Sequence, residues 1–403
     1  MELTPGLRRD PAPQVEAVGQ DEPLVGRIRD EIRRDGPITF ARFMELAVYD
    51  PDGGYYRAGT ARPGGDGDFL TAPETHPIFG AALARGLVEV WERLGRPDPF
   101  MLREYGAGTG TLALAIFDQL ERDRSELAGA IRYDPVEIEA RRLETLGQRL
   151  AAAGRAGVLA DPDDRSRAIV GVAFGNEVLD ALPTHRVVAR EGGLREVLVD
   201  VRDDRFVDVE AEPTTPALVE RLNAGPVHLA DGQHAEICLA LESWIADAAA
   251  GLERGLLLLI DYGYPAAELY DSRRRPGGTL RAYVAHRVHD DPYRHVGRQD
   301  LTAHVDVSAV ERVAVAAGLL DLGTTTQAEF LVGLGIEGLL RAIQADPATT
   351  LEDYLAVRSA LMRLLDPGAM GRFRVMGFGR RWPDGPSLAG FAFRLGRERT
   401  PPA

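Results

Sequence analysis

Apolar and polar positions in the middle of the chain follow the pattern of an α/β protein. Short apolar runs are strand candidates, and longer amphipathic stretches between the first three are helix candidates. The strand candidates are Phe100–Tyr105, Ala130–Ile138, Ile169–Asn176 and Gly255–Asp261, and the helix candidates are Leu112–Arg122 and Arg141–Ala152. Strands that alternate with helices predict a mostly parallel, doubly wound sheet with helices on both faces.

The N-terminal part has a different pattern. Leu24 to Tyr49 carries apolar residues at helical spacing, interrupted by Gly36-Pro37, and predicts a helical lead. Pro51 to Pro73 is rich in glycine and aspartate, which predicts a long loop that is either functional or without fixed structure. Ile78 to Leu94 predicts a helix that Gly95 and Pro97 end.

The segment from Thr184 to Asp231 alternates with a period of two, which predicts antiparallel strands inserted into the α/β pattern. Helices are expected at Ala235–Gly251, Thr302–Gly318, Ala328–Gln344 and Leu351–Leu365, with Pro347 separating the last two. Closing strands are expected at Phe373–Phe378 and Phe391–Leu395.

The strongest functional signal lies between the first strand and the first helix. The residues there are Glu104-Tyr105-Gly106-Ala107-Gly108-Thr109-Gly110. A dinucleotide-binding turn has the form G-x-G-x-x-G, whereas here the third glycine comes one residue earlier. The G-x-G-x-G spacing with an acid ahead of it resembles the first motif of class I S-adenosylmethionine (SAM) methyltransferases. A carboxylate such as Glu104 is suited to hold the ammonium group of SAM.

Composition limits the function classes. The net charge is −15, and all 47 basic residues are arginine. This balance argues against nucleic acid as a partner, because a surface that tracks phosphates needs a basic face. It either favours basic substrates or serves solubility alone. The longest apolar runs are too short to span a bilayer, there is no signal-peptide pattern, and the single Cys238 excludes an internal disulfide; we therefore expect a cytoplasmic protein without a membrane partner.

Two acidic residues are candidates for the adenosine. Glu137 ends the second strand, where a carboxylate can accept both ribose hydroxyls, although an acid that starts a helix has the same pattern. Asp161, before the third strand, is a candidate for the adenine amino group, although Pro162-Asp163-Asp164 beside it is typical of a plain turn.

The segment Asn176-Glu177-Val178-Leu179-Asp180-Ala181-Leu182-Pro183 follows the third strand. Ligands of open α/β sheets bind at the carboxyl ends of strands, so Asn176, Glu177 and Asp180 are expected to face the same crevice as the glycine loop. The alternative is helix capping by Asn176.

The loop before the first long helix, Gly65 to Glu74, is expected to fold over a ligand. Its glycines, Gly67 among them, permit close approach of a ligand. Asp68 can accept hydrogen bonds and Thr71 can donate or accept them, and the alternative is a solvated linker.

Four histidines cluster late, at 286, 289, 295 and 304, but their spacing matches no metal site. His304 is either a base, a substrate ligand or a helix cap. Without a G-x-S-x-G elbow or a Cys/His pair, covalent catalysis is not supported, and no metal is expected.

Seven segments in order, from about Ile38 to Arg380, resemble the SAM-dependent methyltransferases of the MidA type. They are 67–74, 104–110, 176–183, 260–263, 279–283 followed by His286, 300–306 and 325–327. The family has a class I methyltransferase (Rossmann-like) fold with insertions and uses SAM, giving S-adenosylhomocysteine. Its mitochondrial members assist assembly of respiratory complex I and are implicated in methylating an arginine. Many members have Gly-Pro-Gly-Arg-Gly where this chain has Gly106-Ala107-Gly108-Thr109-Gly110.

The candidate cofactor-binding residues are Gly67, Asp68, Thr71, Glu104, Tyr105, Gly106, Ala107, Gly108, Gly110, Glu137, Asp161 and Asn176. Glu177 and His304 are the candidate catalytic residues. Glu74, Asp180, Asp261 and His286 are the candidate substrate residues. If the acceptor is a guanidinium, it arrives charged and must be oriented by carboxylates and lose a proton.

Three functions stay open at this point. The first is transfer of a methyl group to a nitrogen of a protein arginine. The second is methylation of a small metabolite such as an indole or amine. The third is a role as an assembly factor that binds SAM and does not need catalysis. A homodimer is a common state for such chains.

The expected organisation divides the chain at four places. Residues 1–23 are a tail without regular structure, and 24–98 are the helical lead with a ligand-covering loop. Residues 99–183 are the first part of the SAM-binding core, 184–250 are the insertion with antiparallel strands and a helix, and 251–400 complete the core and add a helical substrate-side insertion and α+β elements.

Overall fold

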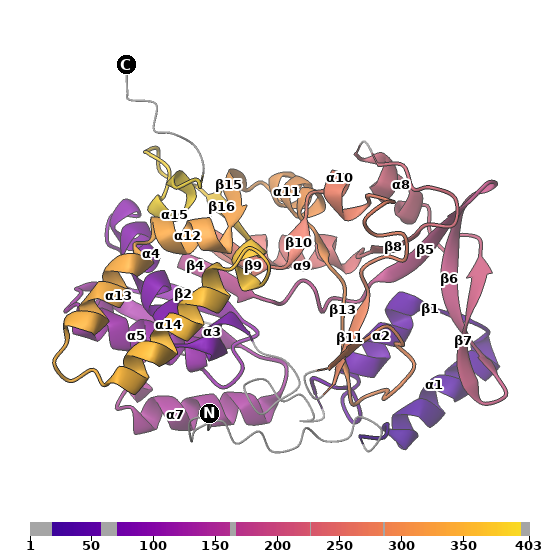
Figure 1. The fold of residues 1–403 in the computed structure, drawn as a ribbon, viewed down its shortest axis with the longest axis horizontal. Coiled ribbons are helices and arrows are strands. Elements are labelled where there is room, and N and C mark those ends of the chain that lie inside the picture. The colour runs from indigo at the N-terminus through magenta and orange to yellow at the C-terminus, as the bar shows by residue number, and fades with distance from the viewer. Residues whose placement is uncertain (1–17, 58–70, 162–166, 226, 285–286, 396–403) are drawn as a thin grey trace, which may run out of the picture.

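A computed structural model gives the fold (Figure 1). It describes residues 18–57, 71–161, 167–225, 227–284 and 287–395. The sheet of six strands found in this part has the order β15-β16-β9-β4-β2-β3. Its strands are β2 (Phe100–Tyr105), β3 (Ile131–Val136), β4 (Ile169–Asn176), β9 (Leu252–Asp261), β15 (Leu320–Thr326) and β16 (Arg374–Arg380).

Strands β9, β4, β2 and β3 are parallel, and β16 runs antiparallel to both of its neighbours, β9 and β15. All four parallel strands were expected from the sequence, and β2 and β4 have the expected bounds. Because β2 has β3 on one side and β4 on the other, the strand order reverses between β2 and β4. A crevice at the carboxyl ends of the strands forms at such a point.

Strand β9 shows why the sheet is covered on both faces. Leu256, Leu258 and Ile260 belong to one hydrophobic cluster, and Leu257 and Leu259 belong to another. Alternate residues of a strand point to opposite faces. The first cluster includes side chains of α4 (Ile78–Arg93), α5 (Thr111–Arg122), α7 (Ala140–Ala152), α12 (Gln327–Gly333), α13 (Ile336–Ala345) and α14 (Leu351–Leu365). The second includes α9 (Ala240–Ala250) and α11 (Val307–Ala316). The doubly wound α/β class is therefore confirmed.

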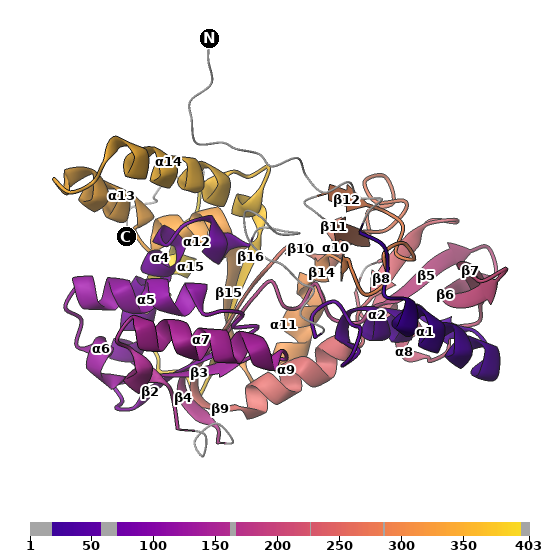
Figure 2. The same ribbon diagram turned by 90° about the horizontal axis from the view of Figure 1, so that it is seen from below.

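A second lobe lies beside the main sheet (Figures 1 and 2). Its five-stranded sheet contains β1 (Ile38–Thr39), β5 (His185–Arg190), β6 (Gly193–Arg202), β7 (Arg205–Ala211) and β8 (His234–Ile237). The expected helical lead is α1 (Glu22–Asp35) and α2 (Phe40–Tyr49), which pack on this sheet. The N-terminal lead and the inserted strands thus share one core, which the local pattern could not show.

Smaller elements connect the lobes. They are β10 (Gly263–Tyr264) paired with β14 (Val305–Asp306), and β11 (Arg281–Val284) between β12 (Arg287–His289) and β13 (Asp300–Thr302). The short helices are α3 (Ala72–Thr75), α6 (Leu127–Ala130), α8 (Ala217–Asn223), α10 (Ala266–Leu269) and α15 (Ala389–Ala392).

Two helix predictions were wrong at their N-terminal ends. The expected helix at 235–251 begins with β8, which pairs with β5, and only Ala240–Ala250 is helical. The expected helix at 302–318 begins only at Val307, because the Asp306 side chain accepts a hydrogen bond from the Ala309 N–H (3.0 Å) and caps α11.

Two C-terminal predictions also need correction. The helix expected at 328–344 is two helices, α12 and α13, that meet at Gly335 with φ +75°. The strand expected at 391–395 overlaps helix α15 instead. Strand β16 already pairs with β9 on one side and β15 on the other, so it offers no free edge to residues 391–395.

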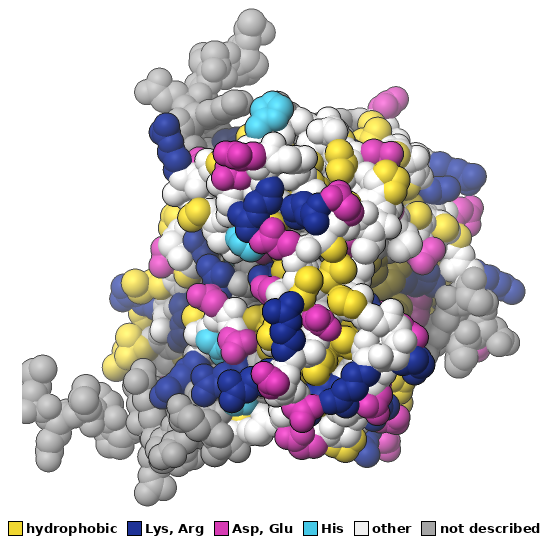
Figure 3. Space-filling view, turned by 90° about the vertical axis from the view of Figure 1, so that its right-hand side faces the viewer, with side chains coloured by type: hydrophobic (Ala, Val, Ile, Leu, Met, Phe, Trp, Pro, Cys, Tyr) yellow, Lys and Arg dark blue, Asp and Glu magenta, His cyan; other side chains and the backbone are white. Residues whose placement is uncertain are grey.

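The outer end of the second lobe faces the viewer in Figure 3, and arginine and acidic side chains intermingle on it. Ion pairs within this lobe include Arg190–Glu210 and Arg195–Glu212. Exposed pairs of this kind add little stability. The division of the chain into five segments that was expected from the sequence assigns functions as well as folds, and it stays a prediction.

Candidate active site

A cavity of about 640 Å³ lies at the carboxyl ends of β2 and β4. Its volume is in the range typical of small-molecule sites, about 300–1,000 Å³. Twelve residues expected from the sequence line it: Thr71, Glu74, Glu104, Tyr105, Gly106, Ala107, Gly108, Glu137, Asn176, Glu177, Asp180 and His304. The cavity thus joins the glycine loop to the segment after β4, which lie about 70 residues apart in the chain.

Gly110, Asp161 and Asp261 were also expected at the site but are not among the residues that line the cavity. Gly67, Asp68 and His286 lie outside the described residues. Gly110 lies behind the loop, where an added Cβ would come within 2.9 Å of the Leu146 side chain. Asp161 is exposed and does not reach the cavity, so an adenine contact is not supported by its position. Asp261 is buried beneath the site.

The glycine loop turns sharply between β2 and α5. Gly106, Gly108 and Gly110 have φ of 69°, 54° and 79°, in the left-handed region that residues with a Cβ rarely adopt. The loop is tied to β3, because Gly106 N–H donates to Val136 O (2.9 Å). An added Cβ on Gly108 would meet no atom within 4 Å, so the cavity reaches the bare backbone there.

Glu104 ends β2 just before this loop. It is buried and accepts a hydrogen bond from the Tyr133 hydroxyl at Oε2 (2.6 Å). Burial, opposed by the Tyr133 hydrogen bond and assisted by nearby Glu137, raises the pKa of Glu104 to about 8. A buried carboxylate that lines a cavity is stabilised by a cation placed there.

Asn176 and Glu137 flank the loop on either side. Asn176 Nδ2 donates to Glu177 (3.0 Å), and its Oδ1 is buried with no hydrogen-bond partner among the described residues. Glu137 accepts from Gly108 N–H (2.9 Å) and Ile138 N–H (2.9 Å), so it both fixes the loop and precedes helix α7. The unmet acceptor of Asn176 and the carboxylate of Glu104 fit a ligand with a positively charged amino group.

Glu177 sits at the turn after β4. Its φ is +53°, which is unusual for a non-glycine residue and is found mainly where the surroundings enforce it. Its N–H donates to Ile260 O (2.8 Å), and its Oε1 accepts from Ala72 N–H (3.1 Å). Burial, and next the neighbouring Asp180, raise the pKa of Glu177 to about 8.

Asp261 explains how this turn is held. Its Oδ2 accepts from the N–H groups of Val178 (3.1 Å), Leu179 (2.8 Å) and Asp180 (3.3 Å). Its Oδ1 accepts from the N–H of Tyr262 (2.8 Å). Four backbone N–H groups thus occupy the Asp261 carboxylate, which positions Glu177 and Asp180, and a contact of Asp261 with substrate stays a prediction.

His304 lines the cavity from the loop between β13 and β14. Its ring packs against Tyr262 (5.4 Å between centroids) and Tyr264 (5.5 Å). Burial, followed by Arg275 and two more arginines, lowers the pKa of His304 to about 4. The ring is neutral at neutral pH and is a weak base, so the geometry favours Glu177 for proton transfer.

Several lining residues had no role assigned from the sequence. They are Tyr49, Tyr56, Arg142, Trp244, Tyr262, Tyr283, Asp300, Arg372 and Phe373. Most come from elements outside the parallel strands, so the α/β pattern of the sequence did not place them at the site. Tyr283 and Asp300 lie in segments 279–283 and 300–306, which carry the family resemblance, but the sequence could not show that both face the cavity.

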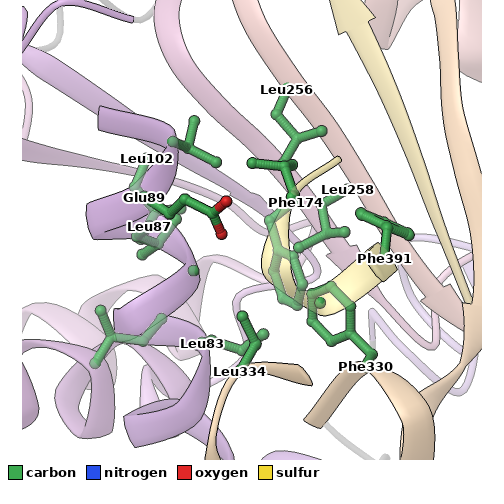
Figure 4. A pocket seen from close by; sticks show the side chains of 15 residues that line it. Leu83, Leu87, Glu89, Leu102, Phe174, Leu256, Leu258, Phe330, Leu334 and Phe391 are labelled. Atoms are coloured by element: carbon green, nitrogen blue, oxygen red, sulfur yellow. The ribbon is translucent and has the colours of Figure 1, made fainter. Parts of the chain in front are cut away.

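A much smaller cavity of about 30 Å³ lies between α4 and the sheet (Figure 4). Leu87, Leu102, Phe174, Leu256 and Phe330 surround it, so it is a gap in the core and not a ligand site. Among the described residues, no group of three or more His, Cys, Asp or Glu side chains could hold a metal ion. No helix in the described ranges is long and apolar enough to cross a membrane.

Residues 82–325 match the family model described as "Putative S-adenosyl-L-methionine-dependent methyltransferase". The chain belongs to this family. The enzyme is a SAM-dependent methyltransferase, and the MidA-type resemblance, the class I fold and the cofactor expected from the sequence are confirmed.

Relatives of known name and structure agree with this assignment. The methyltransferase is 30% identical over 381 residues to the protein arginine methyltransferase NDUFAF7 homolog, mitochondrial, of Drosophila melanogaster, covering 88% of this chain and 84% of that protein. It is 29% identical over 347 residues to human protein arginine methyltransferase NDUFAF7, mitochondrial (80% and 75%). A crystal structure of a Burkholderia thailandensis protein bound to S-adenosyl-homocysteine has 34% identity and a TM-score of 0.83, covering 98% and 99% of the two chains.

These comparisons also correct one expectation. The curated relatives are mitochondrial proteins, which contradicts the cytoplasmic location expected from the sequence. The expectation was wrong because amino-acid composition indicates solubility and the capacity for disulfides but does not determine the compartment of the cell.

Proposed function

We propose that this methyltransferase transfers the methyl group of SAM to a guanidinium nitrogen of an arginine in a protein. The observation that carries the proposal is the acidic acceptor end of the cavity, where Glu74, Glu177, Asp180 and Asp300 line the wall beyond the glycine loop. Carboxylates orient a guanidinium and stabilise its charge. The names of the curated relatives support the same acceptor.

The two ends of the cavity have separate tasks. At the cofactor end, Glu104 and Asn176 would hold the ammonium group, Glu137 the ribose hydroxyls, and the backbone of Gly106 and Gly108 would lie against the cofactor. SAM, when bound, supplies the methyl group of its sulfonium. On transfer of this methyl group the sulfur keeps the electron pair of the broken bond. The protein's contribution is to align the acceptor nitrogen with that methyl group and to exclude water.

At the acceptor end, Glu177 accepts the proton that the guanidinium nitrogen loses when its new bond to carbon forms. A pKa of about 8 places Glu177 close to neutral pH, where a general base is most effective. Its carboxylate is held by the Ala72 N–H and Asn176 Nδ2 at 3.1 and 3.0 Å, which fixes its direction. Glu74 caps α3 through Thr71 and adds negative charge at the same wall.

The test is the substitution Glu177→Gln. Glutamine keeps an oxygen that can accept from Ala72 but cannot take a proton. Protein extract is incubated with methyl-labelled SAM and the purified enzyme, and labelled protein is hydrolysed and searched for methylarginine. We expect label in methylarginine with wild type, and a loss of turnover of about 10²–10⁴-fold in the variant, with S-adenosylhomocysteine affinity unchanged.

Glu352→Gln, an exposed acid on α14, is the matched control and should behave as wild type. Label in a small molecule would show that the acceptor is a metabolite, and binding of the cofactor without any transfer would show a role in assembly. Either result rejects the proposal. A homodimer without nucleic acid or membrane partners is part of the proposal and is checked by sedimentation of the purified chain.

A further inference from the structure

Six side chains beyond Glu177 enclose the far end of the cavity. They come from α2, the segment after it, the turn after β4, the end of β9, and strands β11 and β13. The residues are Tyr49, Tyr56, Asp180, Tyr262, Tyr283 and Asp300, and we name them the acceptor cage. Two carboxylates within four tyrosines are suited to a cation, because tyrosine faces attract positive charge.

Hydrogen bonds fix the walls of the acceptor cage. The Tyr56 hydroxyl donates to Asp300 Oδ1 (2.5 Å), and the Tyr49 hydroxyl donates to the carbonyl of Ala181 (2.9 Å). The rings of Tyr49 and Tyr56 stack at 5.6 Å and 28°. Tyr283 and Asp300 face each other in the pairing of β11 with β13, so their side chains share one face.

Asp180 supplies an independent indication of a missing donor. It is only 5% exposed, and its Oδ1 is buried with no hydrogen-bond partner in the described part of the chain. No described arginine forms an ion pair with it. Burial raises the pKa of Asp180 to about 6, which an occupant with N–H donors and positive charge would reverse. A buried acceptor atom without a partner is rare unless a ligand completes it.

We propose that the acceptor cage is a guanidinium-selective subsite, in which Asp180 and Asp300 accept hydrogen bonds from one arginine side chain and Tyr56 holds Asp300 in place. The inference rests on the methyl transfer to arginine proposed above. A planar guanidinium has donors along several edges and stacks on aromatic rings, so it can reach carboxylates from two different elements at once. A lysine ammonium is compact and strongly hydrated, and it matches such an arrangement less well.

Binding of two tripeptides to the S-adenosylhomocysteine-saturated enzyme tests the subsite. The probes are acetyl-Gly-Arg-Gly-amide and acetyl-Gly-Lys-Gly-amide, measured by calorimetric titration. Wild type should bind the arginine peptide at least tenfold more tightly than the lysine peptide. Asp300→Asn should weaken binding of the arginine peptide at least tenfold, because a charge-assisted hydrogen bond is lost. Tyr56→Phe should cause a smaller loss and keeps the ring.

Asp290→Asn, which changes an exposed acid of the same segment, is the control and should leave both peptides unaffected. Unchanged S-adenosylhomocysteine affinity in each variant shows that the fold and the cofactor end are intact. Equal binding of the two peptides by wild type, or unchanged binding in Asp300→Asn, would overturn the subsite.

The two proposals can fail separately. If Asp300→Asn forms methylarginine with an unchanged KM, the cage is wrong and the proposed function stands. If wild type binds arginine selectively but forms no methylarginine, the proposed function is wrong and the cage stands.

Discussion

The Glu104 carboxylate should lower the stability of the fold and strengthen cofactor binding, and the substitution Glu104→Gln tests both effects. The carboxyl group is buried at the end of β2 beside Tyr133, and its pKa is about 8 against an ordinary value of 4.5. Glutamine has the same shape, can still accept the hydrogen bond from the Tyr133 hydroxyl, and never carries a charge. The variant therefore removes the cost of a buried charge and also removes the partner of the ammonium group.

The direction in which stability changes with pH follows from the number of protons that the folded and unfolded states bind. Between pH 4.5 and pH 8 the folded protein keeps the Glu104 proton, whereas the unfolded chain has released it. Stability from this group is therefore lost as pH rises through that window. Each pKa unit corresponds to about 1.4 kcal/mol, so the free energy of unfolding of wild type should fall by about 3 kcal/mol relative to Glu104→Gln between pH 5 and pH 8.

Urea unfolding at pH 5, 6, 7 and 8 measures this difference, with Glu352→Gln as a control that should follow wild type. Calorimetric titration with S-adenosylhomocysteine measures the functional side, where the loss of a charge-assisted hydrogen bond should weaken binding about 10–150-fold at pH 8. A wild-type-to-variant difference that is constant across pH would show that Glu104 ionises normally. Unchanged affinity would show that Glu104 does not hold the cofactor.

Three further changes test the framework of the site. Gly106→Val places a Cβ 3.1 Å from the Val178 side chain at a φ of +69°, so calorimetry should show no S-adenosylhomocysteine binding, while Gly147→Ala on α7 should bind normally. Arg149 donates to Thr109 O and to two hydroxyl groups of the same loop at 2.7–3.0 Å, so Arg149→Met should raise the KM for SAM several-fold with little change in kcat; an unchanged KM would refute this positioning role. Arg103→Met removes the 2.7 Å ion pair of buried Asp134 and should lower the free energy of unfolding, measured in urea, by about 3–5 kcal/mol. A loss below about 1 kcal/mol would show that other groups stabilise the Asp134 charge.

Local sequence determined the central part of the fold. Short apolar runs placed β2 and β4 at their observed bounds, and the G-x-G-x-G loop with Glu104 identified the cofactor end. These features depend on neighbours within a few residues, since strand periodicity and left-handed glycine turns are local properties.

Pairing between distant segments set the secondary structure where local sequence preference predicted it wrongly. His234–Ile237 became a strand because β5 offered it an edge, and Phe391 became part of a helix because β16 had none to offer. Propensity yields to tertiary contact in such cases. The charge of each site residue was likewise open in the sequence, because burial and neighbours set the pKa values of Glu177 and His304.

The acceptor end depended most on tertiary structure. The sequence supplied Glu177 and Asp180 from one segment, but Tyr49, Tyr283 and Asp300 lie more than about 100 residues from them along the chain. Their meeting needs the N-terminal lead, the inserted strands and the parallel sheet to pack together. The sequence alone therefore determined that the chain binds SAM, because that site is one loop with its flanking strands, whereas the acceptor's surroundings exist only where three distant segments meet.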